Sequence, residues 1–184
     1  MLGYASKLVK GNTLFSIIMF IVISQLMVIN SIFSLVWKYE ILLNDNYAPF
    51  FRELSIYSIF IFVGIASLLF AMIVSIYLFA KNRRMFSTLR IFGATKLSIK
   101  KLFTIISLLY ISISFVICII EVTILYIRYN QFIKTIISTS DIINGIFIVF
   151  CFNIALMAIF MLGSTIINNI LLRKDPYEDL RGTL

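Results

Sequence analysis

The stretch KNRRMFSTLRIFGATKLSIKK, residues 81–101, is the only long polar run inside the chain, and a long hydrophobic run lies on each side of it. It holds seven Lys or Arg residues and no acidic residue. Apolar runs of 18 or more residues with few charges are typical of transmembrane helices. Because loops on the cytoplasmic side are enriched in Lys and Arg, residues 81–101 are predicted to connect two membrane spans in the cytoplasm.

Within this connection, a helical period predicts a short amphipathic helix over residues 82–92. Apolar side chains fall on one side of it and basic side chains on the other: Met85, Phe86, Leu89 and Phe92 against Arg83, Arg84 and Arg90. Gly93 follows at the position where glycine commonly ends a helix in the left-handed conformation. Thr95 can cap a second helix that continues into the next span. The pattern is therefore helix, glycine break, helix.

The sequence Leu89-Arg90-Ile91-Phe92-Gly93-Ala94-Thr95, preceded by the Arg83-Arg84 pair, resembles the cytoplasmic segment of FtsX/MacB-type ABC transporter permeases. In that family the segment includes a coupling helix that docks on a separate ATPase subunit. The resemblance implies that this contact is made by Arg83, Arg84, Phe86, Leu89, Arg90, Phe92, Gly93, Ala94 and Thr95. The chain departs from the family at Met85, where relatives usually carry a glutamate. The alternative is a polybasic loop that lies against anionic lipid.

Composition excludes a soluble domain. The chain has 184 residues, of which 61% are hydrophobic, and a mean hydropathy of +1.06. It has no histidine, and Cys118 and Cys151 lie in apolar runs that favour free thiols, so neither a metal site nor a disulfide framework is expected. The net charge of +8 is concentrated in one loop, so nucleic acid is not implied. No phosphate-binding GxxxxGK[ST] motif occurs, so ATP and Mg²⁺ would have to be bound by a partner ATPase.

The predicted fold is a single all-α membrane domain, residues 1–184, with a cytoplasmic coupling helix between the second and third of four transmembrane helices. The spans are predicted at residues 14–36, 54–80, 102–127 and 142–172. An interfacial segment, 1–13, precedes them, loops cover 38–53 and 128–141, and a tail covers 173–184. Twelve of the 16 Lys and Arg residues fall on the side of residues 81–101, so both termini are expected in the cytoplasm. The resemblance implies a bacterial cell membrane, although sixteen residues at 38–53 cannot form the family's large outer domain.

The spans contain three polar residues and one row of small residues that carry predictions of their own. Gln25 and Asn30 are costly in lipid and are expected to face other helices in a structural role. Glu121 is the only ionisable residue inside a span, which makes it a functional candidate. It lies about 28 Å along the helix from Leu102, so an outer-interface residue that reaches water or a nearby cation is the preferred interpretation. The small residues Gly64, Ser67, Ala71 and Ser75 share one face, which favours a helix-packing seam over a permeation path.

The tail sequence Asp175-Pro176-Tyr177-Glu178-Asp179-Leu180-Arg181 resembles the ending of MacB-like permeases, and the resemblance singles out Glu178, Leu180 and Arg181. The alternative is a simple helix stop at Pro176. Together the two motifs imply the membrane subunit of an ABC transporter, which is itself no enzyme. Two permease chains, identical or related, would join two ATPase subunits to export or extract a peptide, an antimicrobial compound or another amphiphile. The rival hypotheses are a complex that signals or regulates cell-wall hydrolases without transport, and a stand-alone immunity or scaffold protein.

Overall fold

The computed structural model describes residues 2–39, 49–129 and 142–173, and every regular element among them is an α-helix. The helices are α1 (Leu2–Lys10), α2 (Thr13–Tyr39), α3 (Pro49–Lys81), α4 (Arg83–Ile91), α5 (Lys96–Arg128) and α7 (Ile142–Leu171). Four of them, α2, α3, α5 and α7, are long and apolar enough to cross a membrane. The protein is an all-α membrane protein with four spans, as the sequence predicts.

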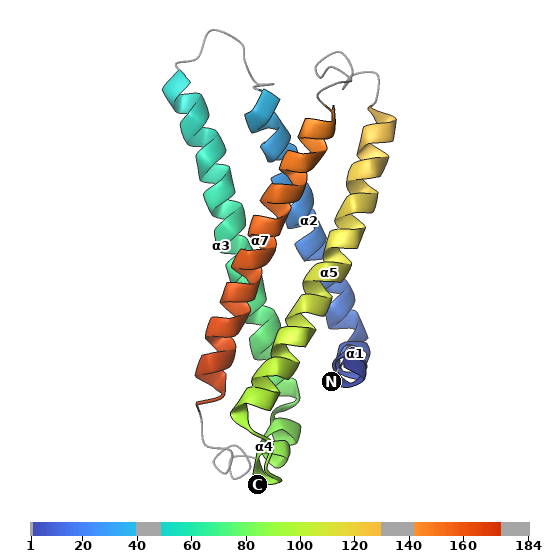
Figure 1. The fold of residues 1–184 in the computed structure, drawn as a ribbon, viewed down its shortest axis with the longest axis vertical. Coiled ribbons are helices and arrows are strands. Elements are labelled where there is room, and N and C mark those ends of the chain that lie inside the picture. Colours follow the sequence, from blue (N-terminus) through green and yellow to red (C-terminus); the bar gives the residue numbers. More distant parts are fainter. Residues whose placement is uncertain (1, 40–48, 130–141, 174–184) are drawn as a thin grey trace.

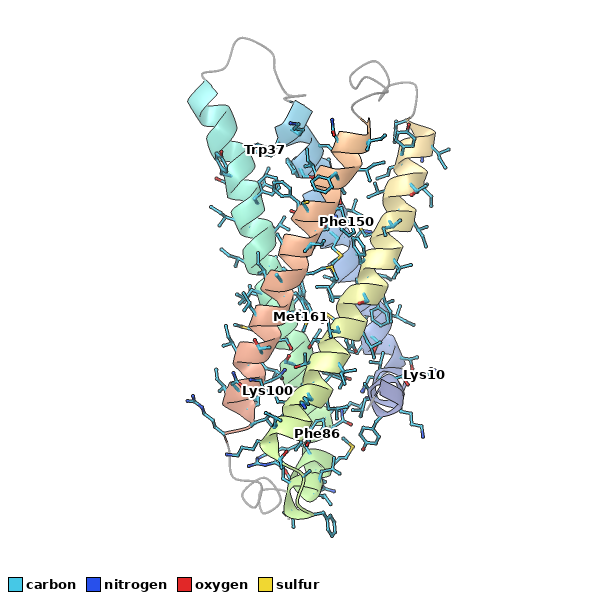
Figure 2. The ribbon with its side chains drawn as sticks, in the orientation of Figure 1. Lys10, Trp37, Phe86, Lys100, Phe150 and Met161 are labelled. Atoms are coloured by element: carbon cyan, nitrogen blue, oxygen red, sulfur yellow. The ribbon has the colours of Figure 1, made fainter. Side chains whose placement is uncertain are left out.

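The four long helices form an elongated bundle, with the short helices α1 and α4 together at one end (Figure 1). We call this the α4 end. Helices α2 and α7 are the central elements, because each of them packs extensively against the other three long helices. Helices α3 and α7 pack against each other most extensively, and α1 packs against the first part of α5. Phe86, Lys10 and Lys100 lie toward the α4 end, and Trp37 lies toward the opposite end (Figure 2).

One helix boundary differs from the sequence prediction. Helix α3 already begins at Pro49, inside the expected loop 38–53, because proline is well suited to the first helical turn, where its missing N–H leaves no bond unmade. Helix α5 begins at Lys96, where Thr95 caps it as predicted, and it continues without a break into the predicted span 102–127. Residues 40–48 and 130–141 of the expected loops lie outside the described residues.

The small residues of α3 form the predicted packing seam against α7. Ser67, Ala71 and Ser75 are buried, and the hydroxyl of Ser75 lies 3.1 Å from that of Ser164 on α7. At Gly163 the backbones approach closely, because a β-carbon added there would lie 3.1 Å from the carbonyl oxygen of Leu68. It would also lie 3.2 Å from the β-carbon of Ala71. Small residues on α3 therefore meet a glycine on α7, and both are needed for this contact.

Replacing Gly163 with alanine is expected to lower the free energy of unfolding by about 1–3 kcal/mol, because the backbone of Leu68 cannot yield to the added methyl group. Gly64→Ala is the matched control. Its added methyl would meet only the tip of Ile159, at 3.7 Å, so it is expected to be neutral or slightly stabilising. Equilibrium unfolding of both variants in mixed micelles measures the difference. Equal stabilisation by both substitutions would mean that α3 and α7 are not in the close contact described here.

Two polar clusters bind the spans together inside the bundle. Near the middle of α7, the amide of Asn153 donates to the Ser31 hydroxyl over 2.8 Å and accepts from the Asn30 amide over 3.2 Å. Closer to the α4 end, the Ser164 hydroxyl is hydrogen-bonded to Ser107 and accepts from the Asn168 amide. Asn30 is 4% exposed, so the prediction that it faces other helices is confirmed. These bonds tie α7 to α2 at one level and to α5 at another.

Candidate functional site

The turn between α4 and α5 is built from two local signals that the sequence places correctly. Gly93 adopts a φ of +92°, and the backbone N–H groups of Gly93 and Ala94 donate to the carbonyls of Arg90 and Leu89. These two bonds form a Schellman motif, which satisfies carbonyl groups left open at the end of α4. Thr95 then caps α5, with its hydroxyl accepting from the Ser98 N–H over 3.2 Å. Four residues, 92–95, connect α4 to α5, and the helix–glycine–helix prediction is confirmed.

Gly93→Ala is expected to lower the free energy of unfolding by about 1 kcal/mol, because a β-carbon is strained at positive φ. The space around the position is not the cause, since no atom lies within 4 Å of the added carbon. Gly93→Asn is the control variant, because asparagine tolerates this conformation better than alanine does. Equilibrium unfolding in detergent compares the two. A stability of Gly93→Ala equal to that of Gly93→Asn would argue that the backbone does not keep its positive φ.

Phe86 anchors α4 to the bundle and is not available to a partner. It is 1% exposed, and its ring lies 4.9 Å from that of Phe103 on α5 and 5.9 Å from that of Phe79 on α3. Leu89 is half-buried on the same side of α4. The apolar side of α4 therefore faces its own spans, which corrects the assignment of Phe86 as a residue that contacts an ATPase. An amphipathic pattern predicts which side of a helix is buried. It does not show whether helices of the same chain or a partner protein bury that side.

Phe92 points the other way. It was expected to share the apolar side with Phe86, and its N–H still makes the helical bond to the Thr88 carbonyl, but Phe92 lies about 120° around the helix from Phe86, at the edge of that side. Its side chain is 84% exposed. Leu97, in the first turn of α5, is 62% exposed, and Ile91 is 38% exposed. We call residues 91–97 the tip.

The tip carries a small exposed apolar surface, and basic side chains lie within the tip and close to it in sequence. Lys96 lies between Phe92 and Leu97 in sequence and is exposed, as is Lys101. Arg84 on α4 is exposed, and Arg83 and Arg90 are half-buried. Exposed aromatic and aliphatic groups close to arginine are typical of the anchors of protein interfaces. Leu97 was missed by the sequence analysis, although its place directly after the capped start of α5 is a signal that could have found it.

Helix α1 packs against the bundle at the α4 end. The hydroxyl of Tyr4 donates to the sulfur of Met85 over 2.8 Å, and Ala5 is fully buried against the bundle. This helix, within the predicted interfacial segment 1–13, packs on α5 and is bonded to α4. Met85, the position at which the chain departs from the family motif, makes a contact inside its own chain. The tip is consequently held by α1 as well as by α3 and α5.

Gln25 and Glu121 are brought together at mid-span. The Gln25 amide donates to Glu121 Oε1 over 2.9 Å, so Gln25 bonds to another helix, although its side chain is exposed. Gln25 lies 12 residues after the start of α2 and 14 before its end, or about 18 Å and 21 Å along the axis. Glu121 is thus bonded to a residue near the middle of α2. That Glu121 reaches water or a cation at the outer interface stays a prediction.

The remaining predicted site residues are placed as follows. Glu178, Leu180 and Arg181 of the tail lie outside the described residues. Within the part of the chain that the structure describes, no three His, Cys, Asp or Glu side chains are grouped so that they could hold a metal ion. Cys118 is a buried free thiol and Cys151 is an exposed one.

An apolar cavity of about 270 Å³ opens between α2, α3 and α7 toward the end opposite α4. Its lining includes Trp37, Tyr57, Phe60 and Phe152, with Asn30 contributing the polar group. Trp and Tyr are enriched at membrane–water interfaces, and Trp37 and Tyr57 both line this cavity. Comparisons of the chain with protein-family models, with curated proteins and with solved structures found no match.

Proposed function

We propose that this chain is the membrane subunit of an ATP-driven complex of the FtsX/MacB permease type, and that the tip docks on a separate ATPase subunit. The observation that carries the proposal is the exposure of Phe92 and Leu97 at the end of a rigidly held turn. Phe92 is 84% exposed, so a partner that covers its ring would bury a large apolar area, and that burial would stabilise the complex. The motif around it resembles a segment that performs this docking in the family.

Such a subunit must also transmit force from the tip, where the ATPase would dock, to the rest of the membrane domain. Helix α5 is continuous over 33 residues, or about 50 Å, and it starts at the tip. Phe103 couples its first turns to α4 through Phe86, and Ser107 couples them to α7 through Ser164. A displacement of the tip by a closing ATPase would therefore move α5 and α7 together. The work would come from ATP, which distinguishes two states of the partner.

The positive-inside rule supports the orientation that this proposal needs. Lys7 and Lys10 on α1 lie at the α4 end of the bundle, together with the seven cations of residues 81–101. An excess of Lys and Arg at one end favours placing that end in the cytoplasm. The tip would then face the compartment that contains ATP.

For the transported compound we propose an amphiphile, such as a peptide or an antimicrobial compound, exported or extracted from the membrane. The cavity between α2, α3 and α7 supports this class, because its lining is aromatic and aliphatic.

Purification of the tagged full-length chain from native membranes in mild detergent tests the proposal. We expect an ATPase subunit to co-purify, and we expect its ATP hydrolysis to rise when amphiphilic peptide is added. Hydrolysis that responds only to a protein at the outer face would favour signalling over transport. Recovery of the chain without any ATPase would support a stand-alone scaffold or immunity protein and contradict the proposal.

A further inference from the structure

Aromatic side chains from three helices line the cavity between α2, α3 and α7. The ring of Phe152 on α7 has its centroid 5.7 Å from that of Trp37 on α2 and 5.0 Å from that of Phe60 on α3. Aromatic rings attract one another beyond simple burial at centroid distances of about 4.5–7 Å. A flat aromatic group that enters the cavity gains such contacts, whereas a flexible alkyl chain does not.

Small residues in the lining leave room for a ligand of this kind. Gly64 on α3 has no side chain, and a β-carbon added there would meet only Ile159, at 3.7 Å. Ala155 on α7 contributes only a methyl group. The volume of about 270 Å³ is nearly twice the ~150 Å³ of an apolar cavity that binds benzene. The cavity can therefore hold a substituted ring or two fused rings.

Asn30 brings one amide group into this apolar lining. Its side chain is 4% exposed, and one amide N–H donates to Asn153 Oδ1 over 3.2 Å. Asn153 in turn donates to the Ser31 hydroxyl over 2.8 Å, so the Asn30 amide is held in one orientation. Among the described residues, none donates to the Asn30 carbonyl oxygen, which can accept two hydrogen bonds. An acceptor in an apolar lining is left unsatisfied unless a ligand or water supplies the donor.

We propose that the cavity binds an aromatic group of one or two rings that carries a single hydroxyl or N–H group, and that this group donates to the Asn30 carbonyl oxygen. The rings pack on Phe60, Phe152 and Trp37. The class includes the tyrosine and tryptophan side chains of a peptide. An alkyl chain of a lipid would fill the same volume but would leave the carbonyl oxygen without a donor. As a statement about the transported compound, the inference rests on the proposed function.

The fluorescence of Trp37 reports binding directly, because Trp37 is the only tryptophan of the chain and lines the cavity. The full-length chain in lipid nanodiscs is titrated with a brominated naphthol, whose bromine quenches a nearby indole, and with its methyl ether, which has the same rings but no donor. We expect saturable quenching by the naphthol, and binding of the ether weaker by about tenfold because one hydrogen bond is lost. Quenching that rises only in proportion to concentration, or equal affinities for the two compounds, would overturn the proposal.

Two pairs of variants locate the site. Ala155→Leu adds bulk inside the cavity and is expected to weaken naphthol binding about tenfold or more. Ala158→Leu makes the same change at an exposed position of α7 outside the lining and is expected to leave binding unchanged. Asn30→Leu is expected to abolish the preference for the naphthol over its ether, whereas Tyr57→Phe, which removes a hydroxyl from the lining, should keep it. An unchanged preference in Asn30→Leu would contradict the proposal, and if that variant does not fold, the two compounds on the unmodified chain decide.

No ATPase is present in these titrations, so this inference and the proposed function can fail separately. Saturable, donor-dependent binding by a chain that co-purifies with no ATPase would support the aromatic site and contradict the proposed function. Co-purification of an ATPase together with purely proportional quenching would support the proposed function and contradict the aromatic site.

Discussion

Phe86→Ala is expected to lower the free energy of unfolding by about 3–5 kcal/mol, the range found when buried aromatic side chains are truncated. The phenyl ring fills the space between α3 and α5 and is 1% exposed, so its removal leaves a cavity in a cluster of three phenylalanines. Its neighbours Phe79 and Phe103 are themselves 6% and 1% exposed and cannot move far to fill it. Equilibrium unfolding in mixed micelles measures the change.

Phe92→Ala is the control, because it removes the same ring from a position 84% exposed and six residues away. We expect it to change stability by less than about 0.5 kcal/mol. The comparison distinguishes Phe86, which packs inside the bundle and holds the turn in place, from Phe92, which is exposed on the turn. Similar losses for the two variants would contradict the different environments assigned to the two rings.

Phe92→Asp combined with Leu97→Asp is expected to weaken binding of the ATPase subunit about 100-fold, or roughly 2.8 kcal/mol. Both side chains are well exposed on the tip, so the variant should fold and insert normally while losing the apolar surface that the partner covers. Titration of the purified ATPase subunit against the chain in lipid nanodiscs, at constant salt, gives the affinity. Constant salt is needed because the surrounding cations make any charge effect depend on ionic strength.

Thr88→Asp provides the control for charge. Thr88 is exposed on α4, so the variant adds a carboxylate near the tip without removing apolar surface. We expect binding to change less than about threefold. Loss of binding in this control equal to that in the double variant would mean that the contact is electrostatic and that Phe92 and Leu97 are not its anchors.

Local sequence signals predicted the parts of the fold that depend on neighbouring residues. The four spans follow from the length of the apolar runs, and the reversal at Gly93 and Thr95 follows from the chemistry of helix ends. The seam of small residues on α3 was also predictable, because only small side chains allow the backbones to approach. Its partner on α7, Gly163, is fixed by the packing between the two helices.

The errors concern distances between helices, which no single segment encodes. The side of α4 that carries Phe86 was identified, but the neighbours that bury it come from α3 and α5. Phe92 lies at the edge of the same side, and the described helices leave it 84% exposed. The bond between Glu121 and Gln25 could not be predicted either, because it depends on how far α5 is displaced along α2.

The most direct test places a photoreactive amino acid at position 92 of the full-length chain and irradiates intact cells. The account predicts a cross-link to a nucleotide-hydrolysing subunit, whereas the same group at Ile61, which is exposed in the middle of α3, should not reach that subunit. Cross-linking of position 92 to lipid alone, or its labelling by a reagent that cannot enter the cell, would contradict the account.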